Sequence, residues 1–203
     1  MKRLFYAAAA LALTACADTV GPGSRASAGG IGPSQAIYGL KDSLYTTQTP
    51  AEFLDAGPNG WQVGTRFSPG YDGKFVGYRF YKAPGETGTH TARLYSYSGQ
   101  LLDSATFVNE TASGWQRVTF TNTVPAYAGD TYYITVNTNV KQAKTYAYFT
   151  NRGDITRYWG YAFGGAYGQP INAFPGSNSG SSFFVDVYFR PVRCDDVVTE
   201  YCW

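Results

Sequence analysis

The sequence predicts an all-β protein, an antiparallel two-sheet β-sandwich of jelly-roll type with about eight strands. Aromatic residues make up 17% of the 203 residues and charged residues only 15%, with 24 glycines, a balance typical of extracellular β-proteins. Apolar and polar residues alternate along residues 74–120 without a helical period. Gly-containing turns divide that stretch into short segments, which indicates a β-meander.

The first sixteen residues indicate where the protein goes. MKR is a basic start, and the apolar run at residues 4–12 is too short to span a bilayer permanently. It leads into Leu-Thr-Ala-Cys at residues 13–16, which resembles the lipobox of bacterial lipoproteins, whose cysteine carries a diacylglyceryl group. We therefore expect a signal peptide over residues 1–15 and lipidation at Cys16, which anchors the protein to the lipid bilayer. Ala17 favours the outer membrane or cell surface. The alternative is an ordinary signal peptide that contains a cysteine.

The two ends of the mature chain are expected to flank one domain. Residues 16–35 are mostly Gly, Ser, Pro and Ala and cannot bury enough apolar surface to fold, which predicts a flexible tether. The β-sandwich is expected over residues 36–192, followed by a tail over residues 193–203. Cys194 and Cys202 lie in this tail, and an oxidising envelope favours a disulfide between them.

The charge balance argues against nucleic acid as a partner. Removing Lys2 and Arg3 with the signal peptide leaves 14 of the 16 basic residues, equal to the 14 acidic residues. No basic field remains to attract a polyanion.

Eight segments are rich in β-branched and aromatic residues, and no helix is required. They span residues 61–68, 74–82, 89–97, 100–109, 114–121, 130–138, 144–150 and 182–190. Alternation predicts that one face of two of these strands is core, comprising Val76, Tyr78, Phe80, Phe183, Val185, Val187 and Phe189. The opposite faces carry Phe75, Phe184, Arg79, Asp186, Trp115 and Arg117. We expect the charged residues among these to remain solvated. Arg79 and Asp186 are candidates for an ion pair.

Three runs in these strands carry a family resemblance. GYRFYK, GETGTHTARLYSYSGQLLDSATFVNETASGWQRVTF and FFVDVYF resemble the bacterial domain of unknown function 4082 family. The resemblance covers residues 36–192, but residues 141–180 are Tyr- and Gly-rich and depart from the family pattern. It implies an extracellular β-sandwich module, of a kind often appended to adhesive or carbohydrate-active proteins, and it implies no catalytic residues.

The sequence gives little support for an enzyme. His90 is the only histidine, so a catalytic triad would have to use it, and no nucleophile elbow lies nearby. One histidine also excludes zinc held by several. A glycosidase needs two facing carboxylates, for which Glu110, Asp103 and Asp186 are candidates. We expect instead that His90 bonds to backbone at a strand end and that Glu110 orders the turn at residues 109–114.

No metal site is predicted. Asp72, Asp130 and Asp154 lie beside glycines in loops, as calcium ligands often do in sandwich modules. There is no clustered calcium motif, so turn formation is the better explanation.

Residues 146–174 form an aromatic-rich stretch with two interpretations. It contains Tyr146, Tyr148, Phe149, Tyr158, Trp159, Tyr161, Phe163, Tyr167 and Phe174. Exposed rings on loops over a rigid sandwich can stack on sugars. The rings can equally pack as a second cluster at an open end of the sandwich. If they are exposed, Tyr158, Trp159 and Tyr161 are the expected ligand-binding residues, with Trp159 dominant. Further candidates are Trp115, Arg79, His90 and Asp186.

The sequence thus predicts a non-catalytic cell-envelope lipoprotein module, without a cofactor, that binds carbohydrate or a surface protein. A structural envelope protein without a small ligand and an envelope hydrolase are the alternatives. An exposed aromatic platform favours binding, whereas a carboxylate pair in a concave pocket favours the hydrolase.

Overall fold

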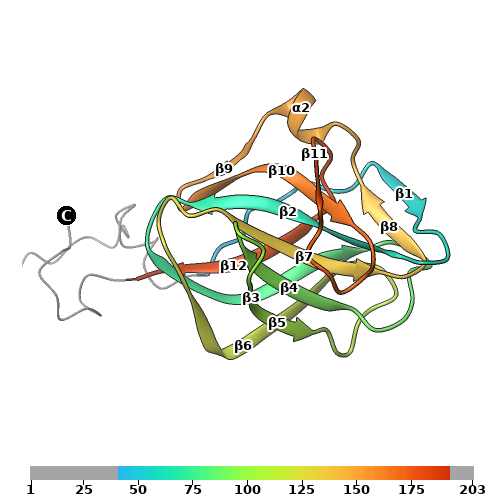
Figure 1. Cartoon of the computed structure of the whole chain (residues 1–203), viewed down its shortest axis with the longest axis horizontal. Coiled ribbons are helices and arrows are strands. Elements are labelled where there is room, and N and C mark those ends of the chain that lie inside the picture. Colours follow the sequence, from blue (N-terminus) through green and yellow to red (C-terminus); the bar gives the residue numbers. More distant parts are fainter. Residues whose placement is uncertain (1–40, 193–203) are drawn as a thin grey trace, which may run out of the picture.

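A computed structural model describes residues 41–192, which fold as an antiparallel β-sandwich (Figure 1). Its strands are β1 Glu52–Asp55, β2 Trp61–Pro69, β3 Gly73–Lys82, β4 Thr91–Ser96, β5 Leu101–Thr106, β6 Gly114–Ala126, β7 Tyr132–Thr138, β8 Lys141–Lys144, β9 Ile155–Arg157, β10 Gly160–Gly168, β11 Ser177–Ser179 and β12 Val185–Pro191. One short helix, α2, spans Tyr148–Arg152. The predicted signal peptide, the lipidation of Cys16, the tether and the Cys194–Cys202 disulfide fall outside the described residues.

Two sheets make the sandwich, and a short ribbon flanks them. The larger sheet has the order β11-β10-β2-β7-β4-β5, with β9 paired to β10, and the smaller has the order β12-β3-β6. β1 and β8 form a separate two-stranded ribbon. The sandwich class is therefore as predicted, because alternating strands with one apolar face must cover that face with a second layer.

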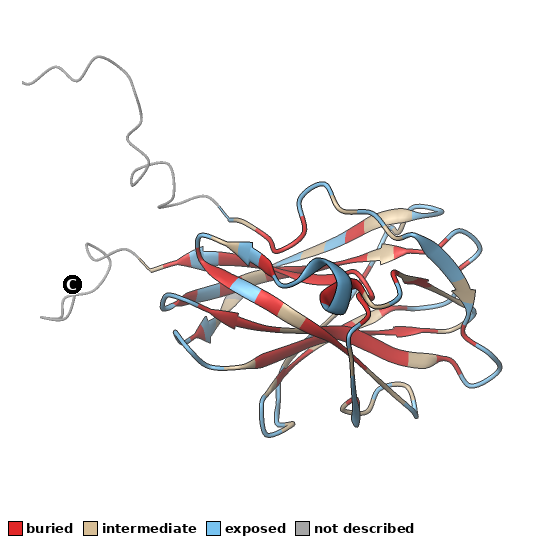
Figure 2. Cartoon of the chain, turned by 90° about the horizontal axis from the view of Figure 1, so that it is seen from above, coloured by how far each residue is buried: buried red, intermediate tan, exposed pale blue. Residues whose placement is uncertain are grey.

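The core lies between the two sheets and is dominated by aromatic rings. Phe67 and Tyr132 of the larger sheet meet Phe75 and Phe189 of the smaller one, and the Phe75 ring contacts Phe67 edge-on at 5.6 Å and Tyr132 at 5.2 Å. All four are buried. Figure 2 shows how the buried residues concentrate in the strands, while the connecting loops are largely exposed.

One β-bulge changes the predicted core face of β3. The register of β3 skips Val76 against β12, from the pair Phe75–Phe189 to the pair Gly77–Tyr188. The extra residue shifts the alternation by one position. Phe75 is therefore fully buried together with Tyr78 and Phe80, whereas Val76 is only partly buried. The prediction that Val76 belongs to the core face and Phe75 to the other was wrong for this reason.

The strand count also differs from the prediction, chiefly after residue 140. Seven of the eight predicted segments contain strands, but residues 144–150 end β8 and continue into α2. The largest omission is β10, which lies next to β2 within the larger sheet. Its sequence, GYAFGGAYG, is too glycine-rich to read as a strand. These glycines serve close packing: a Cβ on Gly165 would lie 2.2 Å from the carbonyl oxygen of Ser181.

Candidate functional site

Arg79 and Asp186, two of the predicted ligand-binding residues, form a buried ion pair. The Arg79 Nη2 and Nε atoms donate to Asp186 Oδ2 at 2.7 and 2.9 Å. Asp186 also accepts the backbone N–H groups of Leu44 and Tyr45, both at 3.0 Å. Burial raises the pKa of Asp186 above its ordinary value of 3.8, although Arg79 and these two N–H donors act in the opposite direction.

This cluster corrects the prediction that both charges face water. The side chains of Arg79 and Asp186 are 8% and 0% exposed, because the chain at Leu44 and Tyr45 covers this face of the smaller sheet. Trp115 adds to the cover, with its ring 4.2 Å from the Arg79 guanidinium carbon. Only the pairing itself was predicted correctly. The cluster fastens the start of the described chain to β3 and β12 and leaves no surface for a ligand.

A second buried cluster surrounds His90. Its Nε2 lies 2.8 Å from Glu86 Oε1, and its Nδ1 lies 2.8 Å from Glu110 Oε2. Lys82 Nζ lies 2.9 Å from the same Glu110 oxygen. The predictions that His90 bonds to backbone and that Glu110 orders its own turn were therefore wrong. The contact between these two side chains instead links the loop that precedes β4 to the loop that follows β5.

Glu86 completes this cluster from the loop after β3. It accepts backbone N–H groups of Asn139 at 2.6 Å and Val140 at 2.9 Å, and also that of Lys141. Burial alone would raise the pKa of Glu86, but the hydrogen bonds from His90 and these three N–H groups together hold the pKa below its ordinary value.

The His90 cluster does not have the form of a catalytic site. The His90 side chain is 0% exposed and that of Glu86 is 1% exposed, so neither can contact a substrate. Both nitrogens of the ring face carboxylate oxygens, which leaves none to act on a nucleophile. Its role is to cross-link three loops at one end of the sandwich.

The aromatic-rich stretch divides between the two interpretations. Trp159 is fully buried and stacks on Phe189 at 4.5 Å with an interplanar angle of 12°, so its ring has no free face and cannot be the predicted binding platform. Tyr158 and Tyr161 are exposed. They lie near the end of β10 that pairs with Ser68 of β2. Neither ring lines one of the two hollows at the edge of the larger sheet.

Other aromatic residues line a hollow at the opposite end of β10. This aromatic hollow has a volume of about 480 Å³ and is lined by Asp55, Trp61, Gln142, Lys144, Tyr146, Tyr167, Ser179, Ser181 and Phe183. The size falls within the roughly 300–1,000 Å³ of small-ligand sites. Tyr167 pairs with Val63 in the register of β2, whereas Tyr161 pairs with Ser68. The six residue-to-residue steps from Tyr161 to Tyr167 place these ends about 20 Å apart at the usual rise of a strand.

Two strands and two connecting segments position the rings of the aromatic hollow. Trp61 begins β2, Tyr167 lies in β10, and Phe183 precedes β12. The Trp61 and Tyr167 rings are 5.9 Å apart and tilted by 55°, and the Tyr167 and Phe183 rings are 6.3 Å apart. Tyr146, just after β8, is 70% exposed. The hollow therefore presents a rigid, partly buried wall of rings and one freely accessible ring.

Polar groups complete this wall. Lys144 Nζ lies 5.2 Å from the Tyr146 ring and 5.5 Å from the Phe183 ring. Within residues 41–192, Lys144 makes no ion pair and the Gln142 side chain makes no hydrogen bond. Both groups are therefore available to a ligand. Ser181 is already engaged, since its Oγ accepts the N–H of Ala147.

A comparison with protein families identifies the domain. The model of a family described as "Domain of unknown function (DUF4082)" matches residues 47–185. The chain belongs to the DUF4082 family. No curated protein matches the sequence. The family description names no activity. The indications of function in this DUF4082 domain are therefore the side chains on its own surface. No helix within residues 41–192 is long and apolar enough to cross a membrane.

Sequence reasoning found part of the aromatic hollow in this DUF4082 domain. Tyr146 and Tyr167 belong to the aromatic-rich stretch singled out above, but Trp61 and Phe183 were assigned only to strands. The signal that was available is that Trp61 directly follows the turn at residues 57–60. The Trp61 ring is only partly buried there. Trp159, which directly precedes β10, is fully buried, so a position at a strand end does not by itself decide exposure.

Two of the three loop aspartates accept a hydrogen bond, and only that of Asp130 is local to its own turn. Asp72 Oδ1 accepts the N–H of Ala128 at 2.8 Å, and Asp130 accepts the hydroxyl of Tyr132 at 3.4 Å. In the described part of the chain, no group of three or more His, Cys, Asp or Glu side chains is placed to hold a metal ion.

Proposed function

We propose that this DUF4082 domain is a non-catalytic binding module that takes a glycan in the aromatic hollow. The observation that carries the proposal is the combination in one concave surface of accessible rings, Trp61, Tyr146 and Tyr167, with two polar side chains. These are Gln142 and Lys144, which make no side-chain hydrogen bond or ion pair with the rest of the described chain. Ring faces stack on the apolar faces of sugars, and amide and ammonium groups bond to the hydroxyls at their edges.

The cell envelope is the proposed location. The Leu-Thr-Ala-Cys sequence at residues 13–16 supports a lipid anchor at Cys16, and two acyl chains hold a protein at a bilayer far more firmly than one. A module anchored in this way meets envelope or extracellular polysaccharides or a surface protein. The Cys194–Cys202 disulfide stays a prediction for the tail of the same protein.

The test is a comparison of two tyrosines that differ in location but not in exposure. Tyr146 in the aromatic hollow is 70% exposed, and Tyr97 in the turn between β4 and β5 is 73% exposed. Affinity electrophoresis of the wild type against a panel of β-glucan, mannan, xylan, chitin and starch first identifies a binder. Tyr146→Ala should then weaken binding by about 2 kcal/mol, the usual cost of losing an anchor residue. Tyr97→Ala should leave binding unchanged.

Two results contradict this proposal. The first is a wild-type protein that binds no polysaccharide of the panel, which favours the alternative of a purely structural envelope protein. The second is an equal loss of binding in Tyr146→Ala and Tyr97→Ala, which removes the role of the aromatic hollow. Thermal unfolding of each variant checks that the fold is retained, which is expected because both rings are mostly in solvent.

A further inference from the structure

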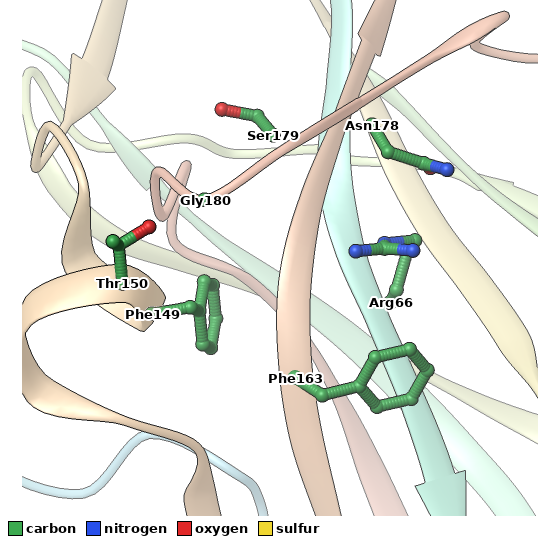
Figure 3. A pocket seen from close by; sticks show the side chains of 7 residues that line it. All are labelled: Arg66, Phe149, Thr150, Phe163, Asn178, Ser179 and Gly180. Atoms are coloured by element: carbon green, nitrogen blue, oxygen red, sulfur yellow. The ribbon is translucent and has the colours of Figure 1, made fainter.

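A second hollow lies beside β11 and is built around Arg66. This Arg66 hollow has a volume of about 330 Å³ and is lined by Arg66, Phe149, Thr150, Phe163, Asn178, Ser179 and Gly180 (Figure 3). Ser179 lines the aromatic hollow as well, so the two hollows adjoin at the edge of the larger sheet. Arg66 lies on the opposite face of β2 from Thr65 and Phe67, which are fully buried.

The shape of β10 leaves space for the Arg66 guanidinium. β10 has a bulge at Phe163, between the pairs Ala162–Phe67 and Gly164–Arg66. The guanidinium carbon lies 5.2 Å from the Phe163 ring, and Figure 3 shows the guanidinium between Phe163 and Asn178. A Cβ on Gly164 would lie 2.3 Å from Arg66 Nη2, so the glycine makes room for the charge. Bulges commonly re-aim side chains at functional sites.

The charge of Arg66 has no hydrogen-bonding or acidic partner among the described residues. Within residues 41–192 its guanidinium forms no ion pair and no hydrogen bond, and its buried Nε lacks an acceptor. Arg79 and Arg157 are instead paired with Asp186 and Asp42. Because an arginine is always ionised and a buried N–H without an acceptor is costly, such a group is suited to an external acceptor.

The remaining lining favours an anion. It contains the hydroxyl of Thr150 and the amide of Asn178, which can donate hydrogen bonds, and it contains no acidic residue. The hydroxyl oxygen of Ser179, which also lines the hollow, already accepts the N–H of Ser181 at 3.0 Å. The volume is about ten times the roughly 30 Å³ of one water molecule in the liquid. The hollow therefore has space for an anionic group together with part of the molecule that carries it.

We propose that the Arg66 hollow binds an oxyanion group, a carboxylate, sulfate ester or phosphate ester, carried by a larger ligand. The guanidinium offers its N–H groups in the planar fork that matches two oxygens of such a group. The aromatic hollow recognises the ligand by ring faces, whereas the Arg66 hollow recognises charge. This second site does not depend on the first being a glycan site.

Pairs of neutral and anionic polymers that share a sugar backbone test this site. Dextran is compared with dextran sulfate, methyl-esterified pectin with polygalacturonate, and inorganic phosphate is added as a competitor. The wild type should bind at least one anionic member about tenfold or more tightly than its neutral counterpart. The member that is preferred distinguishes sulfate from carboxylate, and competition by inorganic phosphate identifies a phosphate-accepting site.

Four variants locate the preference. Arg66→Gln removes the positive charge. Gly164→Ala retains the charge but displaces the guanidinium. Both variants should lose the preference for the anionic polymer. Arg117→Gln is the matched control, because Arg117 is exposed on β6 and makes no ion pair among the described residues; it should bind as the wild type does. Tyr146→Ala should keep the charge preference, which separates this site from the aromatic hollow.

The proposal is overturned by any of three outcomes. The first is a wild type that binds charged and neutral polymers equally and shows no competition by phosphate. The second is a loss of binding in Arg117→Gln as large as that in Arg66→Gln, which shows only general charge attraction. The third is a Gly164→Ala protein that melts like the wild type and keeps the full preference for the anionic polymer. Thermal melting of both site variants is measured alongside binding, so that a folding defect in Arg66→Gln leaves Gly164→Ala as the decisive variant.

Discussion

The buried interior and the edge around β11 treat their charged groups in opposite ways. Inside the protein, Asp186 pairs with Arg79 and Glu86 with His90, and each carboxylate also accepts backbone N–H groups. At the edge, Arg66 and Lys144 have no carboxylate partner within residues 41–192. Buried charges that are fully bonded serve the fold, whereas unpaired charges in concave surfaces are available to ligands. This difference separates structural residues from candidate binding residues.

The largest expected effect tests the interior side of this comparison. Asp186→Ala leaves the buried Arg79 and two backbone N–H groups without their acceptor, which should lower the free energy of unfolding by about 3–5 kcal/mol. Urea denaturation measures the change, with the exposed Asp154→Ala as the control. The double variant Arg79→Leu/Asp186→Leu should cost less than Asp186→Ala, since it leaves no unpaired charge. A loss below about 1 kcal/mol for Asp186→Ala contradicts a structural role.

A pair of aromatic residues from one stretch extends the comparison to rings. Trp159→Ala should lower the free energy of unfolding by about 3–5 kcal/mol, because it removes a large ring from the core. Tyr161→Ala should change it by less than about 1 kcal/mol, since Tyr161 is 43% exposed. Thermal and urea unfolding measure both. Neither residue lies in the aromatic hollow, so loss of polysaccharide binding by the folded Tyr161→Ala protein contradicts the assigned binding surface.

The smallest effect is a pH dependence set by Glu86. Glu86→Gln weakens bonds to His90 and the N–H groups after β7, with an expected cost of about 1–3 kcal/mol at neutral pH. The pKa of Glu86 is lowered in the fold, so its unfolded form binds a proton first as the pH falls, and its stabilising contribution is lost below its ordinary pKa of 4.5. The difference in melting temperature between wild type and Glu86→Gln should therefore shrink as the pH falls below about 4.5. A difference that grows in acid contradicts this sign.

The sequence was sufficient for the sandwich and for most strands, because alternation depends on local residue types. It was not sufficient at Val76, where a bulge shifts the faces, or along β10, where glycines required for close packing hide a strand. The faces of Arg79 and Asp186 were misassigned because a distant segment, Leu44 and Tyr45, covers them. Such cover is a tertiary contact that no local pattern encodes.

The candidate sites were predicted less well than the fold, for a related reason. Composition singled out the aromatic-rich stretch but could not tell Trp159, which meets Phe189 across the core, from Tyr146, which meets solvent. The Arg66 hollow was not anticipated at all. Its signal is an arginine opposite a glycine in neighbouring strands, and that pairing becomes visible only once β10 is placed beside β2.

The two ends of the described chain leave the sandwich from one side. Asp42 bridges Phe189 by backbone hydrogen bonds in both directions, and the N–H of Val192 bonds to Asp72. In Figure 1 these ends lie at the left, whereas β1 and β8, which border the aromatic hollow, lie at the right. A chain with neighbouring ends suits circular permutation and insertion into a host loop. If the domain is inserted into a host protein, both connections lie at the end of the sandwich opposite the aromatic hollow. The domain can therefore be displayed with the aromatic hollow facing outward.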